Sequence, residues 1–509
     1  MGRARAVGLI GLEGTVIEVE AQLAAGLPAF RIVGLPDAAL GEARERVRAA
    51  LHSCGTHLPD RRITVNLSPA SLPKTGTGFD LAIAVAVVAT GAMPGREEAR
   101  RTVHLGELGL DGRVHPVRGV LPMVACAVAA GHPNVVVSRG NALEAALVPG
   151  ARVEAVDHLG DVLALYGIRL DRAPDLEPAA RTVPGDEPAG SPDMADVVGQ
   201  GEARFALEVA AAGGHHLLML GPPGAGKTML ACRLPSILPD LDDDDAVAVT
   251  SIHSIAGTFM PSHGLIRRPP FEAPHHTASP ASIIGGGNGV PRPGAVSKSH
   301  CGTLFLDEAP EFPPAVLQTL RQPLESGQIV LHRARAAARY PARFQLVMAA
   351  NPCPCGSDRD CRCSAGLRRR YIGRLSGPLI DRVDMRVTVP RLTRARAVLG
   401  GLGEPSDVAA ARVAAARRLQ VERYRHQPWS LNSAAPGRYL RGPDAVIDTD
   451  VRRLLERSVE KGTLTMRGLD RVLRIAWTLA DLAGADRPDL ALVGQALCLR
   501  TGGDDAPAI

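Results

Sequence analysis

The chain has 509 residues, enough for two or three domains with substantial hydrophobic cores. Hydrophobic residues make up 45% and charged residues 22%, an ordinary composition for a soluble globular protein. The net charge of +5 is too small to establish a nucleic-acid partner by itself, and the 3% of aromatic residues argues against base stacking as a main mode of binding.

The first residues are not typical of an export signal. Met1–Arg5 is basic, but glycines and a glutamate interrupt the segment that follows, so we expect no signal peptide. The apolar run over residues 81–92 is about 12 residues long, too short for a membrane span, and is better interpreted as a buried helix. We therefore expect a cytoplasmic protein that does not enter a membrane.

Up to about residue 170, short strand-like runs mix with helical runs. The patterns predict strands at Val16–Glu20, Phe30–Val33, Arg62–Leu67, Val114–Val117 and Val135–Val137, and helices at Ala38–His52, Leu81–Ala89 and Met123–Ala130. This mixture predicts an α+β domain over residues 1–170. Residues 171–195 are rich in proline, acids and glycine and lose apolar periodicity, which indicates a linker.

A glycine-rich segment follows the apolar run Leu217–Leu220 and precedes a run of helical character, Met229–Leu234. It reads Gly221-Pro222-Pro223-Gly224-Ala225-Gly226-Lys227-Thr228. Strand, glycine loop and helix in this order are typical of a loop whose backbone N–H groups surround a phosphate. Lys227 is expected to reach the outer phosphates, and the Thr228 hydroxyl to bind Mg²⁺. The segment therefore predicts a nucleotide-binding site.

Two further apolar runs end in polar residues suited to phosphate chemistry. Thr303–Leu306 is followed by Asp307 and Glu308. Downstream of a phosphate loop, the first acid typically holds Mg²⁺ through water, and the second polarises the water that attacks the γ-phosphate. Phe344–Ala350 ends at Asn351, which either orients that water or caps its strand. Both runs are predicted to extend a parallel sheet.

Four of the nine cysteines lie directly after Asn351. Cys353, Cys355, Cys361 and Cys363 form two C-x-C pairs, and four soft ligands in one loop can bind one Zn²⁺ tetrahedrally. The spacing is tighter than that of the usual C-x₂-C pairs, so a thiol-rich loop without metal stays open as the alternative. Without an export signal, a reducing compartment favours metal over disulfides.

In this order, the phosphate loop, the Asp307–Glu308 pair and Asn351 resemble an AAA+ ATPase. Further motifs are similar to the ComM/YifB family of magnesium-chelatase-like ATPases: Ala273-Pro274-His275-His276-Thr277-Ala278-Ser279, Gly285-Gly286-Gly287, Pro291-Arg292-Pro293-Gly294, Leu306–Phe312, Leu320–Glu325 and Asn351–Gly356. The resemblance covers nearly the whole chain and is most specific over residues 196–390. It implies an α/β AAA+ domain with a phosphate loop over residues 196–392 and an all-α C-terminal lid over residues 393–509.

The resemblance also implies a homo-hexameric ring whose ATP sites lie between subunits. The segment Gly377–Asp384 is similar to the one that supplies an arginine finger in trans, with Arg382 as first candidate and Arg374 as second. A surface salt bridge is the alternative for either. Leu464–Arg471 resembles the lid motif that places a second sensing arginine, and here Arg467 is preferred to Arg471.

The segment between Glu325 and Phe344 is predicted to form a hairpin. In rings of this kind such a hairpin points into the central pore, so Arg333 and Arg335 are implied to contact DNA phosphates. The adjacent histidines His275 and His276 have no acid or cysteine beside them and are interpreted as structural or pore-loop residues rather than metal ligands.

The N-terminal domain resembles the Lon proteases, whose fold is that of S5 domain 2, in the segments Leu72–Ala82 and Gly112–Leu121. Gly78 stands where that family has its serine nucleophile, and Leu121 where it has its lysine. We therefore expect a domain without peptidase activity that serves as a scaffold or binds DNA.

Together these resemblances imply a DNA motor that uses ATP and Mg²⁺, with Zn²⁺ as a further candidate ion. The implied activity is that of a branch-migration helicase that promotes DNA integration in recombination and natural transformation, with single-stranded or branched DNA and recombination proteins as partners. A magnesium-chelatase-type ATPase subunit, or another AAA+ remodelling ATPase, is the alternative, against which the expected N-terminal domain and the cysteine loop argue. An ATP-dependent protease is a second alternative, which Gly78 and Leu121 disfavour.

Overall fold

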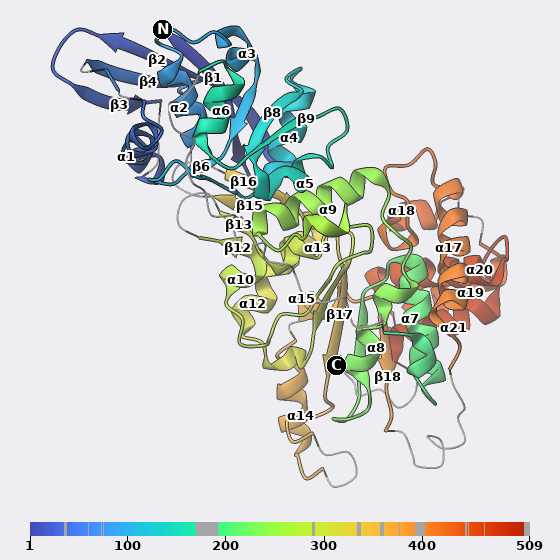
Figure 1. The fold of residues 1–509 in the computed structure, drawn as a ribbon. Helices are drawn as coiled ribbons and strands as arrows, with labels where there is room; N and C mark the ends of the chain where they lie inside the picture. Colours follow the sequence, from blue (N-terminus) through green and yellow to red (C-terminus); the bar gives the residue numbers. More distant parts are fainter. Residues whose placement is uncertain are drawn as a thin grey trace.

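The computed structural model describes the chain apart from residues 35–37, 57, 60, 73, 75, 169–191, 288–290, 333–336, 357–360, 376, 392–402, 443–444, 446, 463 and 503–509. An α+β unit formed by residues 2–168 stands on one end of an α/β unit, and helices from the C-terminal part of the chain pack at the side of the α/β unit (Figure 1). Among the described residues, no helix has both the length and the apolar character needed to cross a membrane.

The N-terminal unit is built on a seven-stranded mixed sheet in the order β3-β4-β2-β1-β5-β8-β9. Its longest pairing is antiparallel, between β1 and β2, with Gly2 opposite Ala21 and Ile10 opposite Glu13. Residues of α2 are apolar on every side because this helix is buried against the sheet. The strands are β1 (Gly2–Ile10), β2 (Glu13–Ala24), β3 (Ala29–Val33), β4 (Arg62–Ser68), β5 (Val103–Leu105), β8 (Asn134–Ser138) and β9 (Arg152–Val156), and the helices are α1 (Ala38–Ser53), α2 (Asp80–Val88), α3 (Arg96–Arg101), α4 (Val120–Ala129), α5 (Ala142–Ala145) and α6 (Leu159–Leu165).

The strand expected over residues 114–117 is shorter in the structure. β7 (Val114–His115) pairs only with β6 (Glu107–Leu108) and ends before Pro116, which has no N–H for a sheet hydrogen bond. The helix expected over residues 123–130 begins three residues earlier, at Val120, after Gly119 in a left-handed conformation with φ of +77°.

The second unit contains a five-stranded, all-parallel sheet in the order β11-β14-β17-β10-β18. Every residue of β10, β14 and β17 is buried, which explains why these strands are continuous apolar runs in the sequence. The carboxyl ends of parallel strands lie at one edge, so the loops after β10, β14 and β17 meet there. The strands are β10 (Leu217–Leu220), β11 (Phe271–Glu272), β14 (Thr303–Leu306), β17 (Gln345–Ala350) and β18 (Met385–Thr388).

The helices around this sheet are mostly short. The helical run expected over residues 229–234 is α8 (Lys227–Ala231) followed by a 3₁₀ turn over Leu234–Ile237, because Pro235 disfavours α-helical backbone at the residue before it. The other helices of this unit are α7 (Gly201–Gly213), α9 (Asp243–Ala256), α10 (Pro280–Ile284), α11 (Ala295–Lys298), α12 (Pro314–Thr319), α13 (Arg321–Ser326), α14 (Ala365–Ile372) and α15 (Gly377–Ile380).

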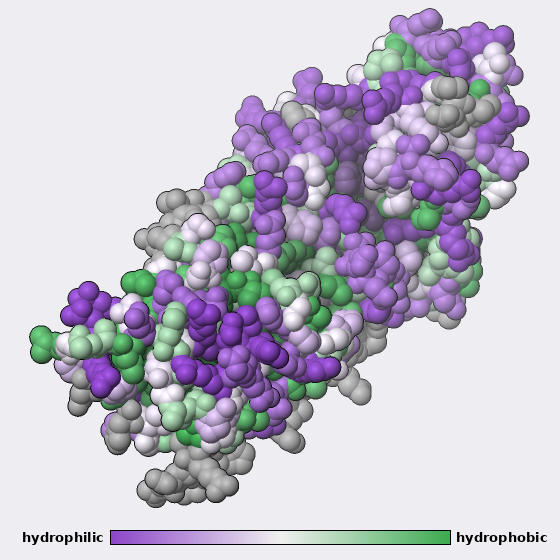
Figure 2. Space-filling view, turned by 90° about the horizontal axis from the view of Figure 1, so that it is seen from above, coloured by the Kyte–Doolittle hydropathy of each residue, from purple (hydrophilic) through white to green (hydrophobic). Residues whose placement is uncertain are grey.

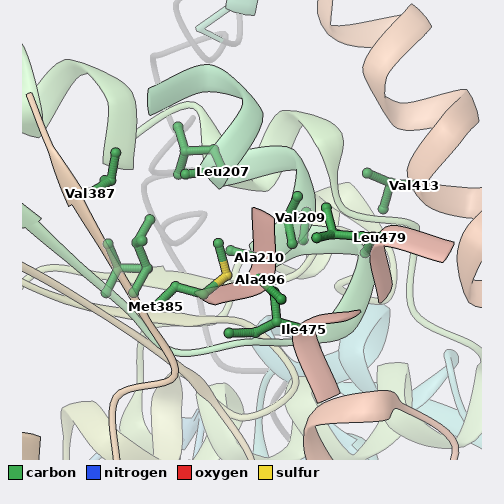
Figure 3. Packing of buried hydrophobic residues seen from close by; sticks show 14 of the residues in the cluster. Leu207, Val209, Ala210, Met385, Val387, Val413, Ile475, Leu479 and Ala496 are labelled. Atoms are coloured by element: carbon green, nitrogen blue, oxygen red, sulfur yellow. The ribbon is translucent and has the colours of Figure 1, made fainter. Parts of the chain in front are cut away.

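The C-terminal helices share one core with the sheet. Figure 3 shows Leu207 and Val209 of α7 and Met385 of β18 packed close to Ile475 and Leu479. Because this cluster is continuous, the C-terminal helices pack directly on the five-stranded sheet. The lid helices are α17 (Ser406–Arg423), α18 (Gly437–Leu440), α19 (Thr449–Glu460), α20 (Met466–Ala483) and α21 (Leu490–Thr501), so the prediction of a helical C-terminal region is confirmed.

A hairpin of β15 (Gln328–His332) and β16 (Ala337–Pro341) lies beneath the N-terminal unit (Figure 1). A Cβ added at Gly11, in the turn between β1 and β2, would stand 2.6 Å from the Arg339 carbonyl oxygen, so this turn is closely apposed to the hairpin. Seen from above in Figure 2, hydrophilic residues cover most of the surface and hydrophobic ones form smaller groups.

Candidate nucleotide site

The phosphate loop leaves β10 at Gly221 and enters α8 at Lys227. A Cβ at Gly221 would stand 2.2 Å from the Val389 carbonyl oxygen, so no other residue fits there without moving the backbone after β18. Gly226 has φ of +91°, a left-handed conformation that side chains disfavour. These two constraints explain why glycines are found at the start and at the end of the loop.

Lys227 is buried within the loop. Its Nζ donates to the carbonyl oxygens of Gly221 at 2.6 Å and Pro222 at 2.9 Å, and to Oδ1 of Asn351 at 3.1 Å. Burial lowers the pKa of Lys227, and the nearby carboxylates of Asp307 and Glu308 oppose part of that shift. The structure therefore brings Lys227 of the phosphate loop into direct contact with Asn351, which follows β17.

Asp307 and Glu308 follow β14 at the same edge of the sheet. Oδ2 of Asp307 accepts a hydrogen bond from the Thr228 hydroxyl at 2.6 Å, so two oxygens suited to Mg²⁺ lie side by side. Glu308 has φ of +49° and its N–H donates to Oδ1 of Asp307 at 2.9 Å. A left-handed conformation at a residue other than glycine costs about 1–3 kcal/mol and is concentrated at functional sites.

These groups surround a cavity of about 400 Å³, within the range of small-molecule sites. Its lining is Pro223, Gly224, Ala225, Gly226, Lys227, Thr228, Met229, Asp307, Glu308, Ala350 and Asn351. A cationic amine, a loop of backbone N–H groups and two carboxylates fit a polyphosphate with its divalent cation, because both signs of charge are present on opposite sides of one cavity.

Two residues at this site were not predicted from the sequence. Nδ1 of His276 lies 3.4 Å from Oε2 of Glu308, although the histidine was interpreted as a structural or pore-loop residue. Gln200 is buried, and its side-chain N–H₂ donates to the carbonyl oxygens of Ala225 at 3.1 Å and Pro390 at 2.8 Å. The motif that contains His276 did not indicate its contact with Glu308, because that contact forms only in the folded sheet, and Gln200 is brought to the loop by tertiary contacts.

Arg382 and Arg374 both form ion pairs within this chain, Arg382 with Glu325 and Arg374 with Glu311 at 3.0 Å. Burial is the largest cause that lowers the pKa of Arg382, and the guanidinium groups of Arg321, Arg467 and Arg471 lower it further. Arg382 and the exposed Arg467 thus lie close to each other.

Arg471, which was ranked below Arg467 as the second sensing arginine, makes closer contacts within the chain than Arg467 does. It pairs with the buried Asp384 and donates to the Arg382 carbonyl oxygen at 3.1 Å. Burial would raise the pKa of Asp384, but Arg471, followed by His216, His215 and Arg474, brings the pKa well below its usual range. Asp384 therefore joins the start of β18 to lid helix α20.

The sulfur atoms of Cys353, Cys355, Cys361 and Cys363 all lie within 4.8 Å of one another. The structure thus brings together the four residues that the sequence singled out as a metal set. Arg333 and Arg335 fall outside the described residues.

In the N-terminal unit, neither protease position offers a reactive group. Leu121 is buried in an apolar cluster, and its N–H donates to Oε1 of Glu144 at 2.9 Å. A Cβ at Gly78 would meet only the methyl groups of Val117, at 3.9 Å.

Comparison with known proteins identifies the family. Family models match three parts of the chain: "Subunit ChlI of Mg-chelatase" over residues 19–141, "Magnesium chelatase, subunit ChlI" over residues 193–397, and "Magnesium chelatase, subunit ChlI C-terminal" over residues 403–500. The chain is 49% identical over 508 residues, 99% of either chain, to the uncharacterised protein Rv2897c of Mycobacterium tuberculosis.

Two further relatives are similar over most of their length. The competence protein ComM of Haemophilus influenzae is 38% identical over 478 residues, which cover 93% of this chain and 92% of ComM. The uncharacterised protein YifB of Escherichia coli K12 is 37% identical over 484 residues, which cover 94% of this chain and 92% of YifB. The chain belongs to the ComM/YifB family of magnesium-chelatase-like AAA+ ATPases.

Proposed function

We propose that this protein is an ATP-driven DNA motor, and specifically a branch-migration helicase that promotes DNA integration during recombination and natural transformation. The observation that carries the ATPase part is the cavity where Lys227, Thr228, Asp307, Glu308 and Asn351 converge. The DNA part is supported by the similarity to a competence protein. The protein acts in the cytoplasm, with recombination proteins as further partners.

In this proposal each residue around the cavity has its own role in ATP hydrolysis. Lys227 binds the outer phosphates, and the adjacent oxygens of Thr228 and Asp307 hold Mg²⁺, which neutralises phosphate charge when bound. Glu308 accepts a proton from the attacking water as its oxygen bonds to the γ-phosphorus, and the bond to the leaving ADP oxygen breaks. Asn351 orients that water beside the lysine it contacts.

We propose that six copies of the chain form a ring, in which an arginine of one subunit completes the ATP site of its neighbour. Arg382 pairs with Glu325, whose side chain is 66% exposed, while the Arg382 side chain is 18% exposed. An incoming phosphate of a neighbouring subunit is proposed to replace Glu325 as the partner of this guanidinium. Arg467, close to Arg382, is proposed as the second sensing arginine, and Arg374 as the alternative finger.

DNA is proposed to pass the β15–β16 hairpin, with Arg333 and Arg335 as phosphate contacts. The N-terminal unit, which lies against this hairpin, is proposed to be a Lon-like, peptidase-inactive scaffold or DNA-binding domain.

A magnesium-chelatase-type ATPase subunit is the second candidate, because all three matching family models carry chelatase descriptions. One of these models covers residues 19–141. The presence of an N-terminal domain is therefore a weaker argument against the chelatase function than the sequence suggested.

The deciding experiment measures ATP hydrolysis by the full chain with and without single-stranded and branched DNA, at low and at higher salt, together with a branch-migration assay. We expect DNA to stimulate hydrolysis, and stimulation to fall with salt because phosphate contacts release counterions. The E308Q variant serves as the matched control, since it keeps the fold and removes the base. Hydrolysis without DNA stimulation, and no DNA binding at low salt, would refute the DNA motor and leave the ATPase assignment standing.

A further inference from the structure

The loop after β17 gathers four thiols into one small cluster. Sγ of Cys353 lies 3.1 Å from that of Cys355 and 3.4 Å from that of Cys361, and the sulfur atoms of Cys355 and Cys361 are 3.6 Å apart. Cys363 completes the set, with all four sulfur atoms within 4.8 Å of one another. Two C-x-C pairs that are separate in the sequence therefore converge on one point.

This spacing fits a tetrahedral metal site and does not fit a disulfide. Zinc binds thiolates at about 2.3 Å, which places the sulfur atoms of a tetrahedral site about 3.8 Å apart. A disulfide needs about 2.05 Å, and even the shortest of these distances, 3.1 Å between Cys353 and Cys355, is far longer. Four sulfur ligands without a carboxylate or imidazole among them favour a soft ion over Mg²⁺ or Ca²⁺.

A second cluster provides an internal contrast. Asp245, His300 and Cys301 also approach within 4.8 Å of one another, but the guanidinium of Arg343 lies 2.8 Å from Asp245 and 3.8 Å from the Cys301 sulfur. That cation already neutralises the carboxylate and would repel a metal ion.

The cluster is adjacent to the nucleotide site along the chain and in space. Cys353 is buried two residues after Asn351, which contacts Lys227. Gly356, with φ of +68°, lies against the tip of the phosphate loop, where an added Cβ would stand 2.8 Å from Cγ of Pro223. The segment that carries the first two cysteines therefore packs on the loop that surrounds the phosphates.

We propose that Cys353, Cys355, Cys361 and Cys363 bind one zinc ion, and that the bound ion holds Gly356 against Pro223 at the tip of the phosphate loop. The metal site stands on the cysteine geometry alone, whereas its coupling to nucleotide binding rests on the proposed ATP site. The ion also fixes the start of α14, whose N-cap Ser364 directly follows Cys363.

The first test is metal analysis of the purified full chain, with wild type expected to hold one zinc per subunit. C361S and C363S, which leave the buried Cys353 unchanged, are expected to lose it, whereas C498S on α21 is the matched control and keeps it. After zinc is exchanged for Co²⁺, wild type is expected to show the visible bands of tetrahedral thiolate coordination. Well under one zinc per subunit, a stoichiometric iron content, or a disulfide detected by thiol counting in the wild type would each overturn the metal site.

The second test measures the affinity of a fluorescent ATP analogue for wild type, C361S and C498S. If the ion orders the phosphate loop, C361S binds the analogue at least about fivefold more weakly, a coupling of the usual size between linked sites. Equal affinities in variants that have lost zinc would overturn the coupling while the metal site stands. No binding of the analogue to wild type would instead refute the proposed ATP site, so the two failures are distinguishable. Far-UV circular dichroism checks that C361S remains folded.

Discussion

Asp384 offers a sharp test of how the lid is attached to the ATPase sheet. Its side chain is 2% exposed, pairs with Arg471 of α20 and accepts a hydrogen bond from the His216 N–H at 2.9 Å. The substitution D384N keeps the shape and an acceptor oxygen for His216, but removes the negative charge opposite Arg471. It therefore isolates the ion pair between the sheet and the lid.

The expected cost follows from burial. Breaking a buried ion pair by removing one partner costs about 3–5 kcal/mol, because the other charge stays desolvated. Arg471 is 15% exposed and retains its bond to the Arg382 carbonyl oxygen, so partial hydration reduces that cost. We expect D384N to lower the stability of the lid by about 2–3 kcal/mol, just below the range of about 3–5 kcal/mol for fully buried pairs.

The chain itself provides the reporter. Its two tryptophans, Trp429 and Trp477, both lie in the C-terminal helical region, so urea unfolding followed by tryptophan fluorescence reports on the lid. A loss of this size moves the urea midpoint down by about 1–2 M. D470N is the matched control, because Asp470 pairs with Arg441 where their side chains are 24% and 38% exposed, and such pairs contribute about 0–1 kcal/mol.

The same residue predicts a dependence on pH. Because the folded-state pKa of Asp384 lies below its unfolded value of about 3.9, its contribution to stability is fully present above that value and is lost as the pH falls towards the folded pKa. Wild type is expected to lose lid stability more steeply than D384N below about pH 4. Equal midpoints for D384N and D470N, and parallel acid profiles for wild type and D384N, would refute the assigned role.

Three substitutions at the nucleotide site test the roles of Glu308, His276 and Arg382. E308Q is expected to bind ATP normally and to lower steady-state turnover by about 10²–10⁴-fold, and retained hydrolysis would contradict its role as base. H276A should lower kcat with little change in nucleotide affinity, because the His276 imidazole lies 3.4 Å from Glu308 and positions it. H275A should have a smaller effect of the same kind, because the His275 ring centroid lies 4.1 Å from that of His276. R382A should lower kcat by about 10³–10⁵-fold. Its activity should recover when R382A subunits are mixed with E308Q subunits, whereas R374A should show no such recovery. If mixing restores no activity to R382A, the proposal that Arg382 acts in trans is contradicted.

The parts of the site that are encoded locally could be predicted from the sequence. The phosphate loop and the Asp307–Glu308 pair each follow an apolar run whose burial in a parallel sheet makes it continuous. The cysteine cluster could be grouped because its members are close in the chain. Contacts between distant segments could not be predicted, because His276 reaches Glu308 only through the pairing of β11 with β14.

β10 pairs with both β17 and β18, so the phosphate loop that follows β10 is contacted from two sides. On one side, Asn351 and Gly356 follow β17 and contact Lys227 and Pro223 of the loop. On the other, Gln200 joins the loop to Pro390, just beyond β18, and the Arg391 guanidinium lies 3.4 Å from the Pro223 carbonyl oxygen. Since β18 also carries the Asp384 link to the lid at its start, a displacement of the loop tip acts on the cysteine cluster and on the lid through separate contacts. Substitutions of Asn351 on one side and Gln200 on the other should therefore have additive effects on nucleotide affinity, because the two side chains bond different residues.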